Sequence, residues 1–483
     1  FLTIQSAIDA VSNSDTILVA SGIYSENINF NGKNIVIQGE DKNNTIIDGA
    51  QGGTVIVIDN TGQSSILRNF TIMNGTGSEF EGLGGNVAGG IYVTQNNTIL
   101  DNLIIKNNSS VAIGGGVFIS ADEVVLKNSI IRNNSTEGDG GGVALLNTNG
   151  INMYNNVIYD NIASEGGALS VQGSNSADIN FCTIYGNSNY GIFIGFNSQM
   201  MLSNSILWDN NDHQIYYRQN NGTADLTIQF SNIKGGQNNI FVNGYGTLDW
   251  GEGNINSNPL FVDYFNQNFM LSEFSPVLGG ASIADLVNID INGNFRPNPV
   301  GTNPDMGAFE SELSNAESVL YGDVTLNGTV SSFDAANILR HVVQLDTLSS
   351  LSVYMGDVSQ NNELSSLDAS YILQYVVGLV DELPYIPEEE TIFTGGLIMD
   401  DIGAVPDMTI EVPIRIMESD NYIYSFKATL DYDHTQLALD TIRTGDYLSE
   451  FLMKHNIIDD GKDIYGEGIN IASRLEGIAE PGG

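Results

Sequence analysis

The first 310 residues consist of short apolar runs separated by polar turns. At the start, Ile4, Ala7, Ile8 and Val11 share one face of a predicted helix that Thr3 caps. Runs such as TILVA, NIVIQG and TIIDG follow, and each is bounded by Asn, Gly or Asp. The pattern predicts one helix that covers the end of a long series of short strands.

The strands recur at a fixed spacing, which indicates one repeated structural unit. A Gly-Gly pair followed by an apolar strand begins at Gly89, Gly115, Gly141 and Gly166, in steps of 26, 26 and 25 residues. A second series of strands begins at Asn69, Asn102, Asn128, Asn156, Cys182 and Asn204. A period of this length, holding two or three strands, predicts one rung of a parallel β-helix with Ile and Val inside.

Polar residues mark the corners of the predicted rungs. Asn107, Asn133, Asn161 and Asn187 recur at one corner, and we expect their amides to form a ladder of hydrogen bonds from rung to rung. Cys182 stands where other rungs carry Asn. We interpret it as a small buried residue without a chemical role.

Both ends of this segment have distinctive sequences. The opening is LTIQSAIDAVSNSDTILVASGIYSENI, and the ending contains NPLFVDYFNQNFMLSEFSPVLGG followed by NPDMGAFE. They are similar to the N-terminal cap and the closing rungs of right-handed β-helix proteins of bacterial surfaces, which are related in fold to pectin lyases. The resemblance covers residues 1–310 and implies a mainly β chain built on a right-handed parallel β-helix. It implies no activity, because lyases, hydrolases and adhesins share this fold.

One unit of sequence occurs twice between Gly322 and Leu379, with its copies 34 residues apart. The copies read GDVTLNGTVSSFDAANILRHVVQL and GDVSQNNELSSLDASYILQYVVGL, each a loop followed by an apolar helix. Oxygen-bearing residues stand at loop positions 1, 3, 5, 9 and 12, and position 7 offers a backbone carbonyl, which suits Ca²⁺. The predicted ligands are Asp323, Thr325, Asn327, Thr329 and Asp334 in the first loop, and Asp357, Ser359, Asn361, Glu363 and Asp368 in the second.

The helices that follow the loops are expected to pack against each other, because each alone is too short to be stable. The expected apolar face comprises Ile338, Leu339, Val342 and Val343 in the first helix, and Ile372, Leu373, Val376 and Val377 in the second. At loop position 6, Gly328 and Asn362 both tolerate the left-handed backbone of a sharp turn.

The duplicated unit, residues 320–384, resembles a type I dockerin. The resemblance implies two bound calcium ions and a cohesin domain as the protein partner. The family's partner-contact positions correspond to Ser332, Phe333, Ser366 and Leu367. Position 3 departs from the family pattern, because Thr325 and Ser359 replace the usual Asp or Asn. A hydroxyl is a weaker ligand than a carboxylate, so we expect weak calcium binding.

The remaining sequence changes character twice. The run IEVPIRI and the later SFKATLDYDHTQLALDTI resemble the first half of a cohesin, a β-sandwich, over residues 391–455. The final DIYGEGINIASRLEGIAEPGG, within residues 456–483, is similar to a segment of class III adenylate and guanylate cyclases. That resemblance implies nucleotide-binding roles for Asn470 and Arg474, which lie on one helical face in the family. The sequence before it supplies none of the family's metal-binding Asp residues, so we expect no cyclase activity.

The charge balance narrows the range of partners. The chain has 16 Lys plus Arg against 58 Asp plus Glu, a formal net charge of −42. Such a surface disfavours nucleic acid and anionic lipid and favours divalent cations. No run of 18 apolar residues could span a membrane. The chain begins without Met, and we expect it to be part of a longer secreted bacterial protein whose signal peptide lies outside it.

Together these features predict an extracellular or cell-surface scaffold or adhesion protein that depends on calcium and assembles on polysaccharide. Two alternatives stay open: a dockerin-bearing polysaccharide lyase or glycoside hydrolase, and a truncated nucleotide cyclase. The sequence assigns no catalytic residue. The nine Lys and Arg residues before residue 300 are scattered, whereas a lyase needs one beside a metal-bound carboxylate.

Two further groups of residues resemble functional sites but have simpler interpretations. Asp209, Asp212, His213 and Arg218 form a catalytic-looking cluster that we interpret as a polar loop at the end of a rung. Exposed aromatic residues could suit sugar rings, but we interpret them as ordinary outward strand residues. They are Tyr92, Phe118, Tyr190 and Phe193.

Overall fold

A computed structural model describes residues 1–59, 64–218, 224–243, 246–284, 286–316 and 319–386, and the backbone of five short strands farther on. The chain forms two compact units, residues 1–385 and residues 386–483. No helix among the described residues has the length and apolar character that crossing a membrane requires. In the second unit, the described strands are β35 (Leu397–Met399), β36 (Ile414–Ile416), β37 (Ser425–Ala428), β38 (Phe451–Lys454) and β39 (Ile469–Ser473).

The first unit begins with α1 (Ile4–Ala10), as the sequence predicts. The Thr3 hydroxyl accepts a hydrogen bond from the Ser6 N–H, and the carboxylate of Glu26 accepts from the first two N–H groups of the helix. These contacts satisfy N–H groups that lack partners inside the helix. The apolar face of α1 is buried and joins the core of the coil.

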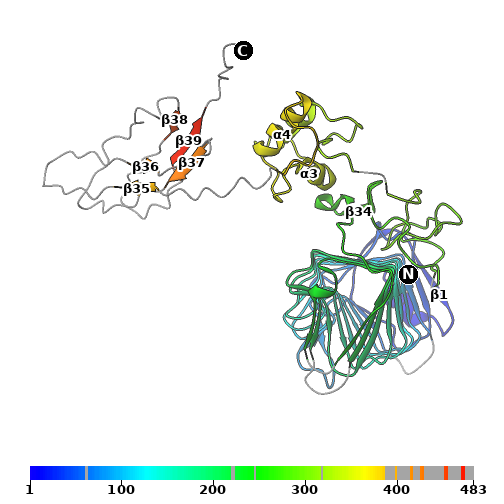
Figure 1. Ribbon diagram of the computed structural model, residues 1–483. Helices are drawn as coiled ribbons and strands as arrows, with labels where there is room; N and C mark the ends of the chain where they lie inside the picture. The colour runs from blue at the N-terminus through cyan, green and yellow to red at the C-terminus, as the bar shows by residue number, and fades with distance from the viewer. Residues whose placement is uncertain are drawn as a thin grey trace, which may run out of the picture. The chain divides into compact units, whose positions relative to one another are not determined.

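Three parallel sheets follow one another around a coil, and each strand pairs with its counterpart in the next rung (Figure 1). The first sheet contains β1 (Thr16–Val19), β4 (Val36–Gly39), β7 (Ile66–Arg68), β12 (Ile99–Asp101), β16 (Val125–Lys127), β20 (Ile151–Tyr154), β23 (Ala177–Asn180), β26 (Ser198–Ser203), β29 (Ala224–Gln229) and β32 (Thr247–Trp250).

The other two sheets contain nine strands each. The second sheet comprises β2 (Gly22–Ser25), β5 (Thr45–Asp48), β8 (Thr71–Met73), β13 (Ile104–Lys106), β17 (Ile130–Arg132), β21 (Val157–Tyr159), β24 (Thr183–Tyr185), β27 (Ile206–Trp208) and β30 (Asn232–Ile233). The third sheet comprises β3 (Ile28–Asn29), β6 (Ile56–Ile58), β11 (Ile91–Val93), β15 (Val117–Ile119), β19 (Val143–Leu146), β22 (Leu169–Gln172), β25 (Tyr190–Ile194), β28 (His213–Arg218) and β31 (Ile240–Asn243).

Short additional elements lie in the turns between these strands. Two pairs of strands form small sheets of their own: β9 (Ser78–Glu79) with β10 (Asn86–Val87), and β14 (Ser109–Ser110) with β18 (Ser135–Thr136). The 3₁₀ helix η1 (Gly236–Asn239) precedes β31.

Alternate apolar side chains fill the inside of the coil. In the first sheet, Leu100, Leu126 and Met153 stack in register on successive rungs, and all three are fully buried. The Gly-Gly pairs stand where the backbones of neighbouring rungs approach closely. A Cβ on Gly115 would lie 2.5 Å from the carbonyl oxygens of Gly141 and Ser135. The Gly-Gly pairs therefore recur once per rung because a larger side chain would clash with the backbone of the next rung.

The corner between the second and third sheets holds the predicted ladder of buried amides, displaced by one residue on two rungs. The ladder comprises Asn108, Asn134, Asn161, Asn187 and Asn210, in which each Oδ1 accepts from the backbone N–H and the Nδ2 of the previous member. The prediction of Asn107 and Asn133 as ladder members was wrong. Both have left-handed φ angles, 55° and 53°, and turn the chain on the outside of the corner.

The corner between the first and second sheets likewise has an outer turn residue and an inner polar residue. The inner residues Ser129, Asn156, Cys182 and Ser205 are linked from rung to rung by hydrogen bonds. Cys182 is fully buried, as expected, and burial raises the pKa of its thiol to about 12. It is therefore a structural residue.

A closing segment folds back over the outer face of the second sheet. Within this segment, β33 (Phe261–Asp263), the 3₁₀ helix η2 (Tyr264–Asn266) and β34 (Asn268–Leu271) form a hairpin. Phe261 and Phe269 pack with Tyr159 and Tyr185 of the sheet, and the Tyr159 hydroxyl donates to Gln267 Oε1 at 2.9 Å.

Farther along the closing segment, Arg296 is buried with two carboxyl groups. Its guanidinium lies 4.0 Å from the Phe181 ring centroid, and its Nε lies 3.6 Å from an oxygen of Glu310. Burial raises the pKa of Glu310 to about 7 and that of Asp305 to about 6, although Arg296 opposes both shifts. These charged groups hold the closing segment together, and the Arg296 guanidinium contacts the coil at the Phe181 ring.

The ladder geometry predicts a large and specific loss of stability in Asn161→Ala. The Asn161 amide exchanges hydrogen bonds with Asn134, Ile131, Tyr159 and Asn187, all at 3.0 Å and all buried. Removing it leaves buried partners unsatisfied, so we expect a loss of about 2 to 4 kcal/mol in urea denaturation.

Asn133→Gly is the matched control, because it removes an Asn side chain one rung away while keeping the left-handed turn. We expect it to cost less than about 0.5 kcal/mol. Equal losses in the two variants would contradict the assignment of the ladder to the inner position.

Candidate functional site

The duplicated loops fold as two nearly identical units. Each loop leads into an 11-residue helix, α2 (Ser332–Val342) or α4 (Ser366–Val376), and α3 (Ser350–Gly356) lies between them. Ser331 and Ser365 are the N-caps of α2 and α4, and each forms a capping box with the Asp three residues later. The predicted position-12 ligand of each loop therefore also begins its helix. The S-x-x-D spacing was a sequence signal for this second role.

In the first loop, two buried carboxylates converge. Asp323 accepts hydrogen bonds from the N–H groups of Asn327 at 3.0 Å and Gly328 at 2.6 Å. Asp334 Oδ1 accepts from the Thr325 hydroxyl at 2.7 Å, and the same hydroxyl lies 3.4 Å from Asp323 Oδ1. Thr325 thus brings the carboxylates of positions 1 and 12 to one point.

The second loop repeats the backbone contacts of the first, while its Ser359 hydroxyl donates to Asp357 at 3.2 Å. Asp357 accepts from the N–H groups of Asn361 at 3.1 Å and Asn362 at 2.9 Å, and Asp368 accepts from the Ser359 N–H at 3.0 Å. At position 6, Gly328 and Asn362 have φ angles of 80° and 66°, as the sharp turn requires.

The donor set fits a hard cation. Each loop offers two carboxylates, an Asn amide, a hydroxyl and a backbone carbonyl, all oxygen donors. Among the described residues, no Lys, Arg or His lies within ion-pair distance of the four Asp carboxylates. Among the described residues, no group of three His, Cys, Asp or Glu residues is placed to hold a metal. Each loop brings two carboxylates together, and the other oxygen donors of its predicted set are neutral.

Comparisons with known proteins identify both parts of the first unit. A family model described as the right handed beta helix region matches residues 7–233, and a model of the dockerin type I domain matches residues 321–377. The first unit contains a right-handed β-helix followed by a dockerin type I domain. Dockerin type I domains bind calcium and bind cohesin domains, and both parts are typical of extracellular proteins.

A search of solved structures found similar chains, including one described as the crystal structure of pectate lyase Pel9A. That chain is 13% identical, has a TM-score of 0.35, and the match covers 64% of this chain and 90% of that one. No curated protein matches the sequence.

The two long helices of the dockerin domain pack through small residues, and most of the predicted apolar face is exposed. Ile338 and Ile372 are buried together with Ala335 and Ala369. The exposed apolar residues are Leu339, Val342 and Val343 on α2, and Leu373, Val376 and Val377 on α4, each at least 40% exposed. Assigning them to the contact between helices was wrong, because Ala335 and Ala369 bring the helices close and leave room for one Ile from each.

The residues predicted to contact a partner lie on the surface at the first turns of α2 and α4. Ser332 and Ser366 are exposed, Phe333 is 64% exposed, and Leu367 is 43% exposed. The sequence duplication thus gives two equivalent surface patches, one on each long helix.

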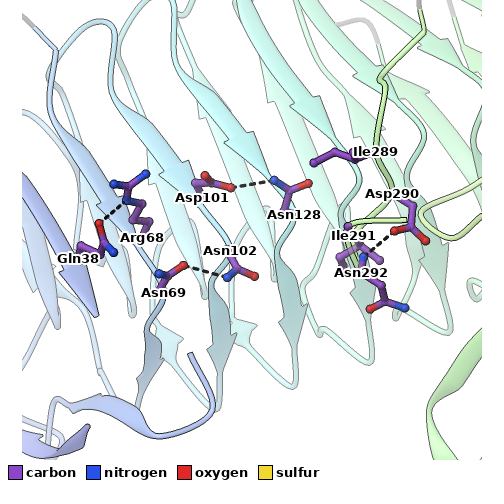
Figure 2. Close-up of a pocket in the computed structure, with 11 residues that line it drawn as sticks. Gln38, Arg68, Asn69, Asp101, Asn102, Asn128, Ile289, Asp290, Ile291 and Asn292 are labelled. Carbon is purple, nitrogen blue, oxygen red and sulfur yellow. Dashed lines mark hydrogen bonds between the residues drawn. The ribbon is translucent and has the colours of Figure 1, made fainter. Parts of the chain in front are cut away.

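The β-helix carries an open polar groove of about 420 Å³ along the corner between the first and second sheets (Figure 2). Its floor and one wall are formed by Gln38, Arg68, Asn69, Asp101, Asn102, Asn128 and the segment 289–293. The Arg68 Nε donates to Gln38 at 3.0 Å, while the Asp101 carboxylate accepts from Asn128 at 2.8 Å and lies 3.8 Å from Lys127.

The segment that forms the wall of the groove is held in place by hydrogen bonds. Asp290 Oδ1 accepts from the N–H groups of Asn292 at 2.9 Å and Asn294 at 2.8 Å. The Asn155 amide donates to the Ile289 carbonyl at 2.7 Å and joins the wall to the corner of the coil. No sequence pattern indicates this groove, because its lining residues lie far apart in the chain.

Asp209 and His213, two members of the catalytic-looking cluster, contact different partners. Asp209 accepts a hydrogen bond from the Tyr185 hydroxyl and pairs with Lys234, whereas His213 packs against Tyr190. The side chain of Arg218 lies outside the described residues.

The outward aromatic residues stack on one another along the third sheet. Tyr92 lies between Phe80 and Phe118, and Tyr216 lies between Tyr190 and Phe241. Each central ring has aromatic neighbours toward both faces, and Phe118 and Phe193 are buried. The expectation that these aromatic residues are exposed was wrong for Phe118 and Phe193, while the stacking along the sheet agrees with their interpretation as ordinary strand residues.

Most of the cohesin-like segment 391–455 and of the cyclase-like segment 456–483 lies outside the described residues. Asn470 belongs to β39, which pairs with β37 and β38, whereas the cyclase resemblance implied a helix there. Apolar and polar residues alternate in the run INIAS, which is a strand pattern. Arg474 lies outside the described residues.

The loop geometry predicts that Asp334→Asn selectively weakens calcium binding. The change removes one of two carboxylates in the first loop, so we expect calcium affinity at that loop to fall at least roughly tenfold while the second loop still binds. Isothermal titration calorimetry on the full chain measures this. Ser331→Ala is the control, because it removes the N-cap and keeps the carboxylate. An equal affinity loss in both variants would show that helix capping, and not ligation, is what the carboxylate contributes.

Proposed function

We propose that this protein is an extracellular, calcium-dependent assembly protein. Its dockerin domain binds two calcium ions, one per loop, through the residues predicted from the sequence. It then attaches the chain to a cohesin domain of another protein. The β-helix serves as a shaft whose polar groove contacts polysaccharide.

The paired surface patches carry the docking part of this proposal. Phe333 and Leu367 are large apolar side chains that point into solvent next to the calcium loops. Exposed apolar groups beside polar ones are typical of protein interfaces. Since the calcium loops lead directly into the first turns of α2 and α4, calcium would order the backbone that presents these residues.

The groove supports a contact with polysaccharide. It combines amides, a guanidinium and a carboxylate, which can donate to and accept from sugar hydroxyls, with Ile289 and Ile291 on its wall. Its volume lies in the range of ligand sites. The amides of Asn69, Asn102 and Asn128 are fixed in place by hydrogen bonds to neighbouring rungs: Asn69 donates to the Gly39 carbonyl, Asn102 donates to Asn69, and Asn128 accepts from Asn155.

A dockerin-bearing lyase or hydrolase is the alternative that shares this docking chemistry. It would require a general acid or base free to exchange a proton with the substrate. Two carboxylates line the groove, and both are already engaged. Asp101 is held by Asn128 and Lys127, and Asp290 accepts hydrogen bonds from the N–H groups of Asn292, Asn294 and Glu310. This arrangement favours binding over bond cleavage at the groove.

The docking proposal predicts that Phe333→Asp combined with Leu367→Asp abolishes binding to a type I cohesin domain. Charged residues at both patches would be costly to bury in an interface, so we expect at least a roughly hundredfold loss of affinity in calorimetry with calcium present. Ile283→Asp, at another exposed apolar residue outside the dockerin domain, should bind normally. Cohesin binding that persists in EGTA would contradict the requirement for calcium.

The groove proposal predicts that Arg68→Ala weakens polysaccharide binding. Affinity electrophoresis in gels containing soluble neutral or uronate-rich polysaccharides should retard the wild-type chain and retard the variant less. Arg132→Ala is the control, because Arg132 lies over Tyr159 on the second sheet, outside the groove. Equal mobility of wild type and Arg68→Ala in every gel would overturn the assignment of the groove.

A further inference from the structure

The short helix α3 of the dockerin domain packs against the closing hairpin of the β-helix. Leu351 and Met355 of α3 are buried against Leu260 of the closing segment, and the partly buried Phe274 packs beside them. Two hydrogen bonds fix the start of the helix. The Tyr264 N–H donates to the Ser350 hydroxyl at 2.9 Å, and the Ser350 N–H donates to Asp263 Oδ1 at 3.2 Å.

The other end of α3 is hydrogen-bonded to the start of both loops. Asp357, the first ligand of the second loop, is the C-cap of α3, and its N–H donates to the Val353 carbonyl at 3.1 Å. Gly322, which precedes the first ligand of the first loop, donates its N–H to the Met355 carbonyl at 2.8 Å. One helix therefore connects the hairpin of the β-helix to the first ligand of each loop.

We propose that the dockerin domain is anchored to the β-helix through α3, and that this anchoring and calcium binding stabilise each other. The inference rests on the calcium binding proposed above. A seven-residue helix is too short to be stable alone, so its order depends on the partners at its two ends. The hairpin holds its N-terminal end, and the calcium loops hold its C-terminal end.

Ordering α3 costs free energy. If the contact with the hairpin orders the helix first, calcium binds without that cost, and the same holds for the hairpin contact when calcium binds first. Such coupling must be reciprocal. Calcium should therefore protect the hairpin, which contains none of its ligands, and the hairpin should raise the affinity for calcium. The same contact covers one side of the dockerin domain and leaves α2 and α4 to receive a partner.

The test measures both directions of the coupling in the full chain. First, hydrogen–deuterium exchange of residues 260–274 is followed with calcium and with EGTA, and we expect calcium to slow it at least roughly threefold. Second, calorimetry measures calcium affinity in Asp263→Ala, which removes the acceptor that caps α3 from the β-helix side. We expect roughly a threefold or greater loss of affinity at one or both loops.

Glu273→Ala is the matched control, because it removes one negative charge from the same segment at an exposed residue that makes no hydrogen bond with the described residues. It should bind calcium like the wild type. Unchanged calcium affinity in Asp263→Ala, or hairpin exchange that is independent of calcium, would overturn the coupling while leaving the calcium sites intact. A wild-type chain that binds no calcium would overturn the proposed function together with this inference.

Discussion

The β-helix depends on the requirement that polar groups buried at each corner find partners on the next rung. A side-chain amide meets this requirement well, because it donates to the rung on one side and accepts from the rung on the other. Asn134, Asn161 and Asn187 do so without interruption, and their carbonyl oxygens also satisfy backbone N–H groups that the turn removes from the sheets. The apolar core can then stack in register. The Gly-Gly pairs are a second consequence, since rungs held this close leave no room for a Cβ.

The sequence was sufficient to predict the coil, because every rung repeats the same steric and hydrogen-bonding requirements. It placed the amide ladder one residue off in two rungs, where the corner reads Asn107-Asn108 and Asn133-Asn134. Each corner needs an outer residue with a left-handed φ and an inner amide, and Asn suits both positions. The rungs with Asp160-Asn161 and Gly186-Asn187 resolve the ambiguity, because only one position there can be the amide.

The calcium loops and the groove differ in how far apart their residues lie in the sequence. All the predicted ligands of a loop fall within 12 residues, so spacing alone led to the candidate site, and the structure confirms the sharp turn expected at position 6. The groove joins corner residues between Gln38 and Asn128 to the segment 289–293, and that segment is positioned by packing of the closing residues. No local pattern could place it there. The prediction that the apolar residues of α2 and α4 form the contact between the helices failed for a related reason. Only the packing of the two helices shows that Ala335 and Ala369 form this contact.

The closing segment covers the outward aromatic residues of the second sheet. Tyr159 and Tyr185 of the second sheet support β33 and β34, and these strands in turn support α3 of the dockerin domain. In a chain with a net charge of −42, the dockerin loops gather buried carboxylates that no described basic residue neutralises. A divalent cation would relieve this repulsion at the C-terminal end of α3. The outer packing of the β-helix and the electrostatics of the loops therefore act on the same short helix.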